Sequence, residues 1–191
     1  MAWLLFLLVP VLVIDIGFAQ VSRQDIEVFQ KQLLQNPNDP DLNYNMAQAY
    51  FLLGNTDQTI RYLERTLSLS PGDAMVMLKL ASVYRKIGHL ADARTLLLRA
   101  VDIAPEEADF WYELGVVYSD LANYEAGIKA FQKALHSSRS EDQKFLIIYY
   151  TGLLHLSNRD WGNYQDCLRR LRPEPKYYDE LKKLGHFWRK D

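Results

Sequence analysis

Similar residues recur along this chain every 34 positions, and this recurrence constrains the fold more than any other feature. Three tyrosines and three prolines share the interval: Tyr50, Tyr84 and Tyr118, with Pro37, Pro71 and Pro105. A unit of this length cannot bury its apolar side chains alone, so neighbouring copies must stack to form a continuous core. The recurrence therefore predicts a solenoid of stacked units.

The clearest copy spans residues 108–135 and predicts two short amphipathic helices. Trp111, Leu114 and Tyr118 lie three or four positions apart, so they share one face of the first helix. A second apolar stripe follows in the rest of this copy. Asn123 stands between the two stripes, where its side chain can accept hydrogen bonds from the first turn of the second helix. Each unit is thus expected to be a helix pair.

These residues carry a family resemblance. Trp111, Leu114, Gly115 and Tyr118 match the pattern W-x2-L-G-x2-Y, and the closing proline recurs at the 34-residue period. The chain resembles the tetratricopeptide repeat family, in which each repeat is a helix–turn–helix. The resemblance implies an all-α, right-handed superhelical solenoid.

The 34-residue frame divides the chain into predicted segments. We expect a signal peptide or membrane anchor at 1–19, a capping helix in 20–39, repeats at 40–73, 74–107 and 108–141, a degenerate fourth repeat at 142–178 and a C-terminal capping helix in 179–191. The frame slips after the third repeat, because Gly152 lies 37 residues after Gly115. We interpret this slip as a turn at 137–141 that is three residues longer than the earlier ones.

The N-terminal residues predict export. The apolar stretch Ala2–Ile14 has 13 residues, about 20 Å as a helix. This is shorter than the roughly 30 Å core of a bilayer and typical of a signal peptide. Cleavage after Ala19 would release the protein into a periplasmic or secretory compartment. The alternative is an uncleaved anchor that runs on through Phe18 and leaves the protein tethered to the membrane.

Composition and motifs argue against several classes of function. The formal charge is −2 with no concentrated basic face, so no nucleic-acid partner is expected. Cys167 is the single cysteine and is predicted to be a small core residue. The chain has no phosphate-binding loop, metal motif or nucleophile elbow, and its four histidines are scattered. We therefore expect no catalytic residue, no metal and no cofactor, and no enzyme activity.

The resemblance implies instead a groove, lined by the first helix of each repeat, that binds a helix or extended peptide of another protein. Carried onto this chain, the groove positions are Asp41, Tyr44, Gln48, Phe51, Leu78, Ser82, Arg85, Lys86, Asp109, Tyr112, Val116, Asp120 and Tyr149. The family's chaperone-docking members use Lys and Asn at positions that here hold Tyr44 and Gln48, so a carboxylate clamp is not expected. Arg85 and Lys86 form a small basic spot for an anionic group of the partner.

Two other functions stay open at this point. The first is self-association through the terminal helices, which would make the protein a homo-oligomeric assembly scaffold. The second, which the absence of paired acid–base groups disfavours, is an enzyme with a site in the groove.

Overall fold

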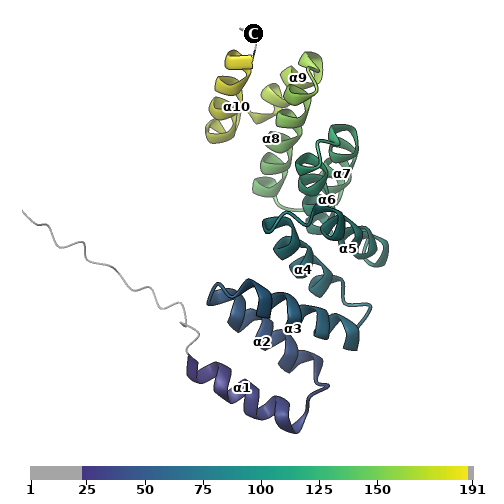
Figure 1. Ribbon diagram of the computed structural model, residues 1–191. Helices are drawn as coiled ribbons and strands as arrows, with labels where there is room; N and C mark the ends of the chain where they lie inside the picture. The colour runs from purple at the N-terminus through teal and green to yellow at the C-terminus, as the bar shows by residue number, and fades with distance from the viewer. Residues whose placement is uncertain (1–22, 189–191) are drawn as a thin grey trace, which may run out of the picture.

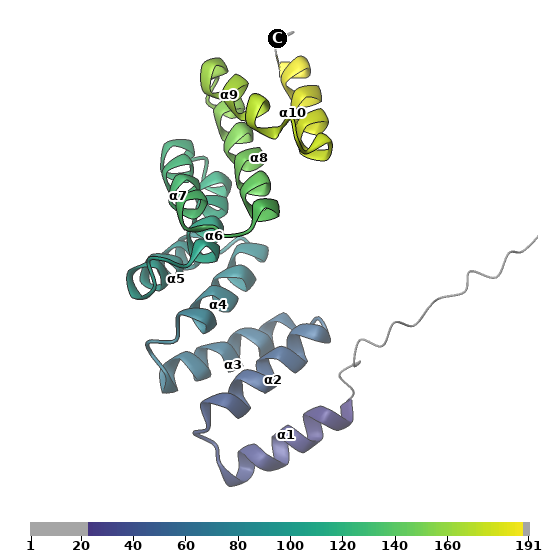
Figure 2. The same cartoon turned by 180° about the vertical axis from the view of Figure 1, so that it is seen from behind.

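The computed structural model describes residues 23–188, which form ten α-helices and no strand (Figure 1). The helices are α1 (Arg23–Gln35), α2 (Pro40–Leu52), α3 (Thr56–Leu69), α4 (Ala74–Lys86), α5 (Leu90–Ile103), α6 (Ala108–Asp120), α7 (Tyr124–Ser137), α8 (Glu141–Ser157), α9 (Trp161–Leu171) and α10 (Pro175–Trp188). Each helix packs on its neighbours in sequence, from α1 at one end to α10 at the other (Figures 1 and 2). The fold is the predicted all-α repeat solenoid.

The helices alternate in role along the solenoid. We call α2, α4, α6 and α8 the first helices, and α3, α5, α7 and α9 the second helices. The first three pairs keep the 34-residue period, with first helices of 13 residues and second helices of 14. The largest group of buried residues extends from Ala47 to Ala130 and so spans all three pairs.

The bends inside the four helix pairs all have the same backbone geometry. Its central residue has a positive φ: 72° at Gly54, 83° at Gly88, and 55° at both Ala122 and Arg159. The next N–H donates to the carbonyl five residues earlier, as from Asn55 to Tyr50 at 2.9 Å. This bonding ends a helix with a left-handed residue, which glycine adopts at least cost. The recurring tyrosine position is therefore also the position whose carbonyl closes each bend.

Side-chain caps start most of the helices. Asn55 accepts from the N–H of Gln58 at 3.2 Å. Asn123 accepts from the N–H of Ala126 at 3.3 Å, which confirms its predicted role. Asp39, Asp73 and Asp160 cap α2, α4 and α9 in the same way. Such caps satisfy N–H groups that have no partner within the helix.

Small residues let the helices of the third pair approach closely. A methyl group added at Gly115 would lie 2.6 Å from the ring of Phe131, so only glycine fits there. Ala134 is fully buried on the facing helix.

The prediction that the frame slip lies in a lengthened turn at 137–141 was wrong. The linker before α8, residues 138–140, is one residue shorter than the linkers of four residues before α4 and α6. The additional residues lie instead within α8, which has 17 residues where the earlier first helices have 13. An amphipathic helix can absorb four residues, about one turn, with little change in which face is apolar.

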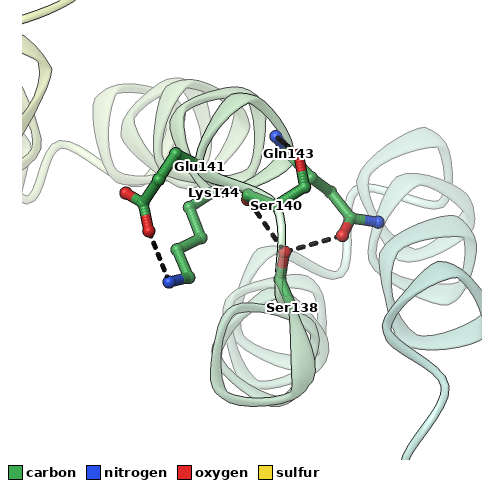
Figure 3. Close-up of polar contacts among 5 residues, drawn as sticks. All are labelled: Ser138, Ser140, Glu141, Gln143 and Lys144. Atoms are coloured by element: carbon green, nitrogen blue, oxygen red, sulfur yellow. Dashed lines mark hydrogen bonds and ion pairs between the residues drawn. The ribbon is translucent and has the colours of Figure 1, made fainter.

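A hydrogen-bonded connection explains why this linker is short (Figure 3). The buried Ser138 hydroxyl donates to Oε1 of Gln143 at 2.6 Å, and the Ser140 hydroxyl accepts from the Gln143 N–H at 3.4 Å. Gln143 also donates through Nε2 to Asp109, so the start of α8 is tied to the start of α6.

The terminal helices pack on the ends of the described solenoid. In α1, Ile26, Phe29 and Leu33 pack towards α2, whereas Leu34 is 84% exposed. At the other end α10 begins at Pro175, so the division expected between residues 178 and 179 falls inside this helix.

Among the helices of residues 23–188, none has both the length and the apolar character needed to cross a membrane. The predicted signal peptide or anchor, residues 1–19, lies outside the described residues.

Candidate partner-binding face

The predicted groove positions lie on the first helices, and we call this set of thirteen residues the first-helix face. Its members differ in accessibility. Exposed residues are Asp41, Gln48, Phe51, Lys86, Asp109 and Asp120; half-buried residues are Tyr44, Leu78, Ser82, Arg85, Tyr112 and Val116; Tyr149 is buried. The face therefore offers six accessible side chains, mostly polar or charged, beside a set that also packs within the solenoid.

Arg85 is not a free cation. Its Nη1 lies 3.3 Å from Oδ2 of Asp120, and its Nε lies 3.9 Å from Oε2 of Glu113. Burial raises the pKa of the Glu113 carboxyl, while the Arg85 charge acts in the opposite direction. Asp120 is among the predicted groove positions and Glu113 is not, because nothing in the spacing of Glu113 distinguishes it from a solvated helix residue.

Lys86 is the accessible cation of the predicted basic spot. Its Nζ lies 4.8 Å from the centre of the Phe51 ring, on the first helix of the preceding repeat. Lys86 makes no ion pair with a residue in the described part of the chain. The structure thus brings Phe51 and Lys86 together across two repeats, as an exposed apolar ring beside an unpaired ammonium group.

An aromatic cluster occupies the middle of the face. The Tyr112 ring lies 5.8 Å from that of Phe131 and 5.7 Å from that of Tyr150, so Tyr112 packs between α7 and α8. Burial raises the pKa of the Tyr112 hydroxyl, and the neighbouring Tyr150 adds to the rise. Tyr149 lies beyond this cluster and packs against Tyr177 of α10, with ring centres 5.5 Å apart. The last helix therefore covers Tyr149, which sequence reasoning placed in the groove.

Two buried titratable groups outside this face, Cys167 and His155, are parts of the core. Burial raises the pKa of the Cys167 thiol to about 11, consistent with a core residue. His155 is buried, with its Nδ1 3.2 Å from Oδ2 of Asp160 in the bend after α8. Within residues 23–188, no cluster of three histidine, cysteine or carboxylate side chains is arranged to hold a metal ion.

The repeat geometry agrees with the comparison to known families. Two models described as tetratricopeptide repeat match the chain, one over residues 40–106 and the other over residues 78–143. Together they span more than half of the sequence. The chain belongs to the tetratricopeptide repeat family. No curated protein sequence matches it significantly.

Solved structures show the same tetratricopeptide-repeat fold at low sequence identity. The MamA RS-1 ArsTM double mutant matches with a TM-score of 0.71 at 22% identity, covering 84% of both chains. MamA 41-end from Desulfovibrio magneticus RS-1 matches with a TM-score of 0.68 at 21% identity, covering 85% of both. A further crystal structure of MamA matches at 0.67 and 20% identity, covering 87% of this chain and 90% of that one.

The family and the fold make this protein a scaffold for protein–protein interaction. Scaffolds of this fold are typically not enzymes. The arrangement of the first-helix face also suits binding rather than chemistry, because its charged groups are paired with one another or lie in solvent.

Proposed function

We propose that the protein binds a helix or extended segment of a partner protein along its first-helix face, in an envelope or secretory compartment. The observation that carries this proposal is the pair Phe51 and Lys86, an exposed ring beside an unpaired cation. An apolar side chain of the partner would pack on Phe51, and a carboxylate would pair with Lys86. Burial of apolar area supplies affinity, and the charge supplies orientation.

Arg85 has a smaller part in this proposal than the sequence suggests. A carboxylate of the partner would have to compete with Asp120 and Glu113 for the guanidinium group. Lys86 is therefore the better anion contact of the two.

Substitution of the exposed pair tests the proposal. Phe51→Ser with Lys86→Glu should remove the partner from a crosslinking pull-down without lowering the melting temperature, since both side chains are exposed. The matched control is Ile103→Ser with Arg94→Glu, which changes the same kinds of exposed side chain on second helix α5. Loss of the partner in both variants, or in neither, would refute a specific role for the first-helix face.

The compartment is tested separately by sequencing the N-terminus of the protein purified from its cells. A start at Gln20 supports export with cleavage, and an intact start supports a membrane tether. A start elsewhere would contradict both forms of the proposal.

Self-association is a second candidate function, and α10 favours it. The spacing Leu184-Gly185-x2-Trp188 repeats Leu114-Gly115-x2-Tyr118, so α10 corresponds to a first helix. At equivalent positions Leu114 and Val117 are 1% and 0% exposed, whereas Leu184 and Phe187 are 36% and 71% exposed. The difference arises because no second helix follows α10 in the described chain. An α10 from another copy would cover this face.

Sedimentation over a range of concentrations tests this candidate. The protein should dimerise in a concentration-dependent manner, and Phe187→Glu should make it monomeric. Leu34→Glu is the control, because it adds the same charge at an exposed apolar position of α1. A monomer at the highest concentration would exclude self-association as the function.

A further inference from the structure

Two neighbouring hollows on the side of the second helices occupy equivalent repeat positions but differ in charge. The α3–α5 hollow, of about 480 Å³, is lined in part by Glu64, Leu80, Tyr84, Asp92 and Arg99. The α5–α7 hollow, of about 650 Å³, has its counterparts 34 residues later: Leu98, Leu114, Tyr118, Ala126 and Lys133. The repeat thus supplies an internal comparison of the same site with two sets of side chains.

In the α3–α5 hollow the polar groups satisfy one another. The Tyr84 hydroxyl donates to Oε1 of Glu64 at 2.6 Å. Arg99 donates through Nη2 to the carbonyl oxygen of Pro71 at 3.1 Å. Asp92 adds a second carboxylate to the lining. The Tyr84 hydroxyl and the Arg99 guanidinium group of this hollow thus have acceptors within the chain.

In the α5–α7 hollow both carboxylates are missing. Leu98 stands where the earlier hollow has Glu64, and Ala126 stands where it has Asp92. The hydroxyl of Tyr118 is retained, but no residue of the described chain accepts a hydrogen bond from it. Tyr118 therefore occupies the same repeat position as Tyr84 but lacks the carboxylate acceptor that Glu64 gives to Tyr84.

The α5–α7 hollow has more basic side chains than the α3–α5 hollow. Lys133 replaces Arg99, and Lys129 replaces Thr95. Neither lysine makes an ion pair with a residue between 23 and 188. His136 lies beside them, and no carboxylate lines the hollow. Leu98, 43% exposed, Trp111 and Leu114 supply an apolar floor.

We propose that the α5–α7 hollow binds an acidic segment of a partner protein, in which an apolar side chain is flanked by Asp or Glu. The apolar side chain packs on Leu98 and Trp111. A flanking carboxylate accepts from the Tyr118 hydroxyl and pairs with Lys129 or Lys133, and so supplies the acceptor that Glu64 supplies to Tyr84 within the chain. Charge-assisted hydrogen bonds of this kind fix orientation as well as adding affinity.

This site is separate from the first-helix face, because its lining on α5, α6 and α7 includes none of the thirteen residues of that face. Binding here therefore does not depend on Phe51 or Lys86. Substitutions in the two places give independent outcomes, and either proposal can fail without the other.

The test is an NMR titration of the isotope-labelled protein with a synthetic peptide that has two leucines between runs of Asp and Glu. The amides around Leu98, Tyr118, Lys129 and Lys133 should shift, and the affinity should fall as salt is added. A peptide with lysine in place of every acidic residue is the control and should not bind the hollow.

Two substitutions at one position make the test sharper. Leu98→Glu restores the internal carboxylate and should weaken binding of the acidic peptide by about tenfold or more, since one strong charged contact is worth about that factor. Leu98→Gln introduces a side chain of the same size as Glu without the charge and should weaken binding less.

The double variant Lys129→Glu with Lys133→Glu should abolish binding of the acidic peptide. Equal affinity for acidic and basic peptides, no difference between the Glu and Gln variants, or shifts confined to the residues of the first-helix face would overturn the proposal.

Discussion

Gly115 of α6 lies directly against the ring of Phe131 on α7, and this ring is enclosed by its neighbours. Phe131 is 1% exposed and is held between Tyr112 and Tyr150. A methyl group at position 115 would overlap this ring at 2.6 Å. The position therefore needs glycine for space, and not for backbone freedom.

Gly115→Ala should destabilise the protein by about 1–2 kcal/mol, because overpacking costs about 1–3 kcal/mol and better helix propensity returns part of it. Chemical denaturation measures the change. Gly72→Ala is the control, since nothing lies within 4 Å of its added methyl group. Equal stability of the two variants would show that α6 and α7 can separate at no cost.

Cys167 gives a pH-dependent prediction at the same scale. Its pKa is raised to about 11, so the reactive thiolate is scarce at pH 8. Alkylation by iodoacetamide at pH 8 should be about a hundredfold slower than for a thiol of ordinary pKa, and it should accelerate up to pH 10 instead of levelling off near pH 9. The denatured protein provides the reference rate. A native rate equal to it would contradict the burial of this thiol.

At the scale of elements, α10 matters because it closes the core of the last pair. The Leu181 side chain is fully buried and lies against Gly152 of α8. Its carbonyl oxygen accepts a hydrogen bond from the Tyr164 hydroxyl of α9 at 3.0 Å. Without α10 the group formed by Tyr149, Cys167 and Leu168 would be open to water.

Leu181→Ala should lower the free energy of unfolding by about 2–5 kcal/mol, as for other buried leucines. Leu184→Ala, three residues further along the same helix and 36% exposed, should change it by less than about 1 kcal/mol. Thermal or chemical unfolding of both variants makes the comparison. Similar losses would mean that α10 packs through a different face.

The elements also show what could be predicted from sequence. The 34-residue recurrence predicts the helix pairs and their bends, and the gap between two apolar stripes predicts the cap at Asn123, because these depend on local spacing. The extra length of α8 was placed in the wrong segment, since an insertion in a helix and one in its linker shift the later residues equally. The cover of α10 over Tyr149 and the pairing of Glu113 with Arg85 depend on contacts between separate elements, which spacing does not encode.

On the scale of the whole molecule, stability is distributed unevenly along the solenoid. Helices α4 and α5 lie inside the largest group of buried residues. Helix α1 is held mainly by the packing of Ile26, Phe29 and Leu33 against α2. In a stacked repeat protein each unit is stabilised by its nearest neighbours, so the ends open more readily than the middle.

Hydrogen exchange followed by mass spectrometry should therefore show faster exchange in peptides from α1 than in peptides from α4 and α5. The Ile26→Ala variant should accelerate exchange in α1 and leave α5 unchanged. Uniform protection along the chain would indicate a single cooperative unit and contradict this expectation.

The longer α8 has a consequence for any extended ligand. An array of identical units would accept such a ligand in several positions, each displaced by one unit, with equal energy. Helix α8 exceeds the earlier first helices by four residues, about 6 Å along its axis. Shifted positions are thus no longer equivalent, and one alignment of the ligand along the array is favoured over its neighbours.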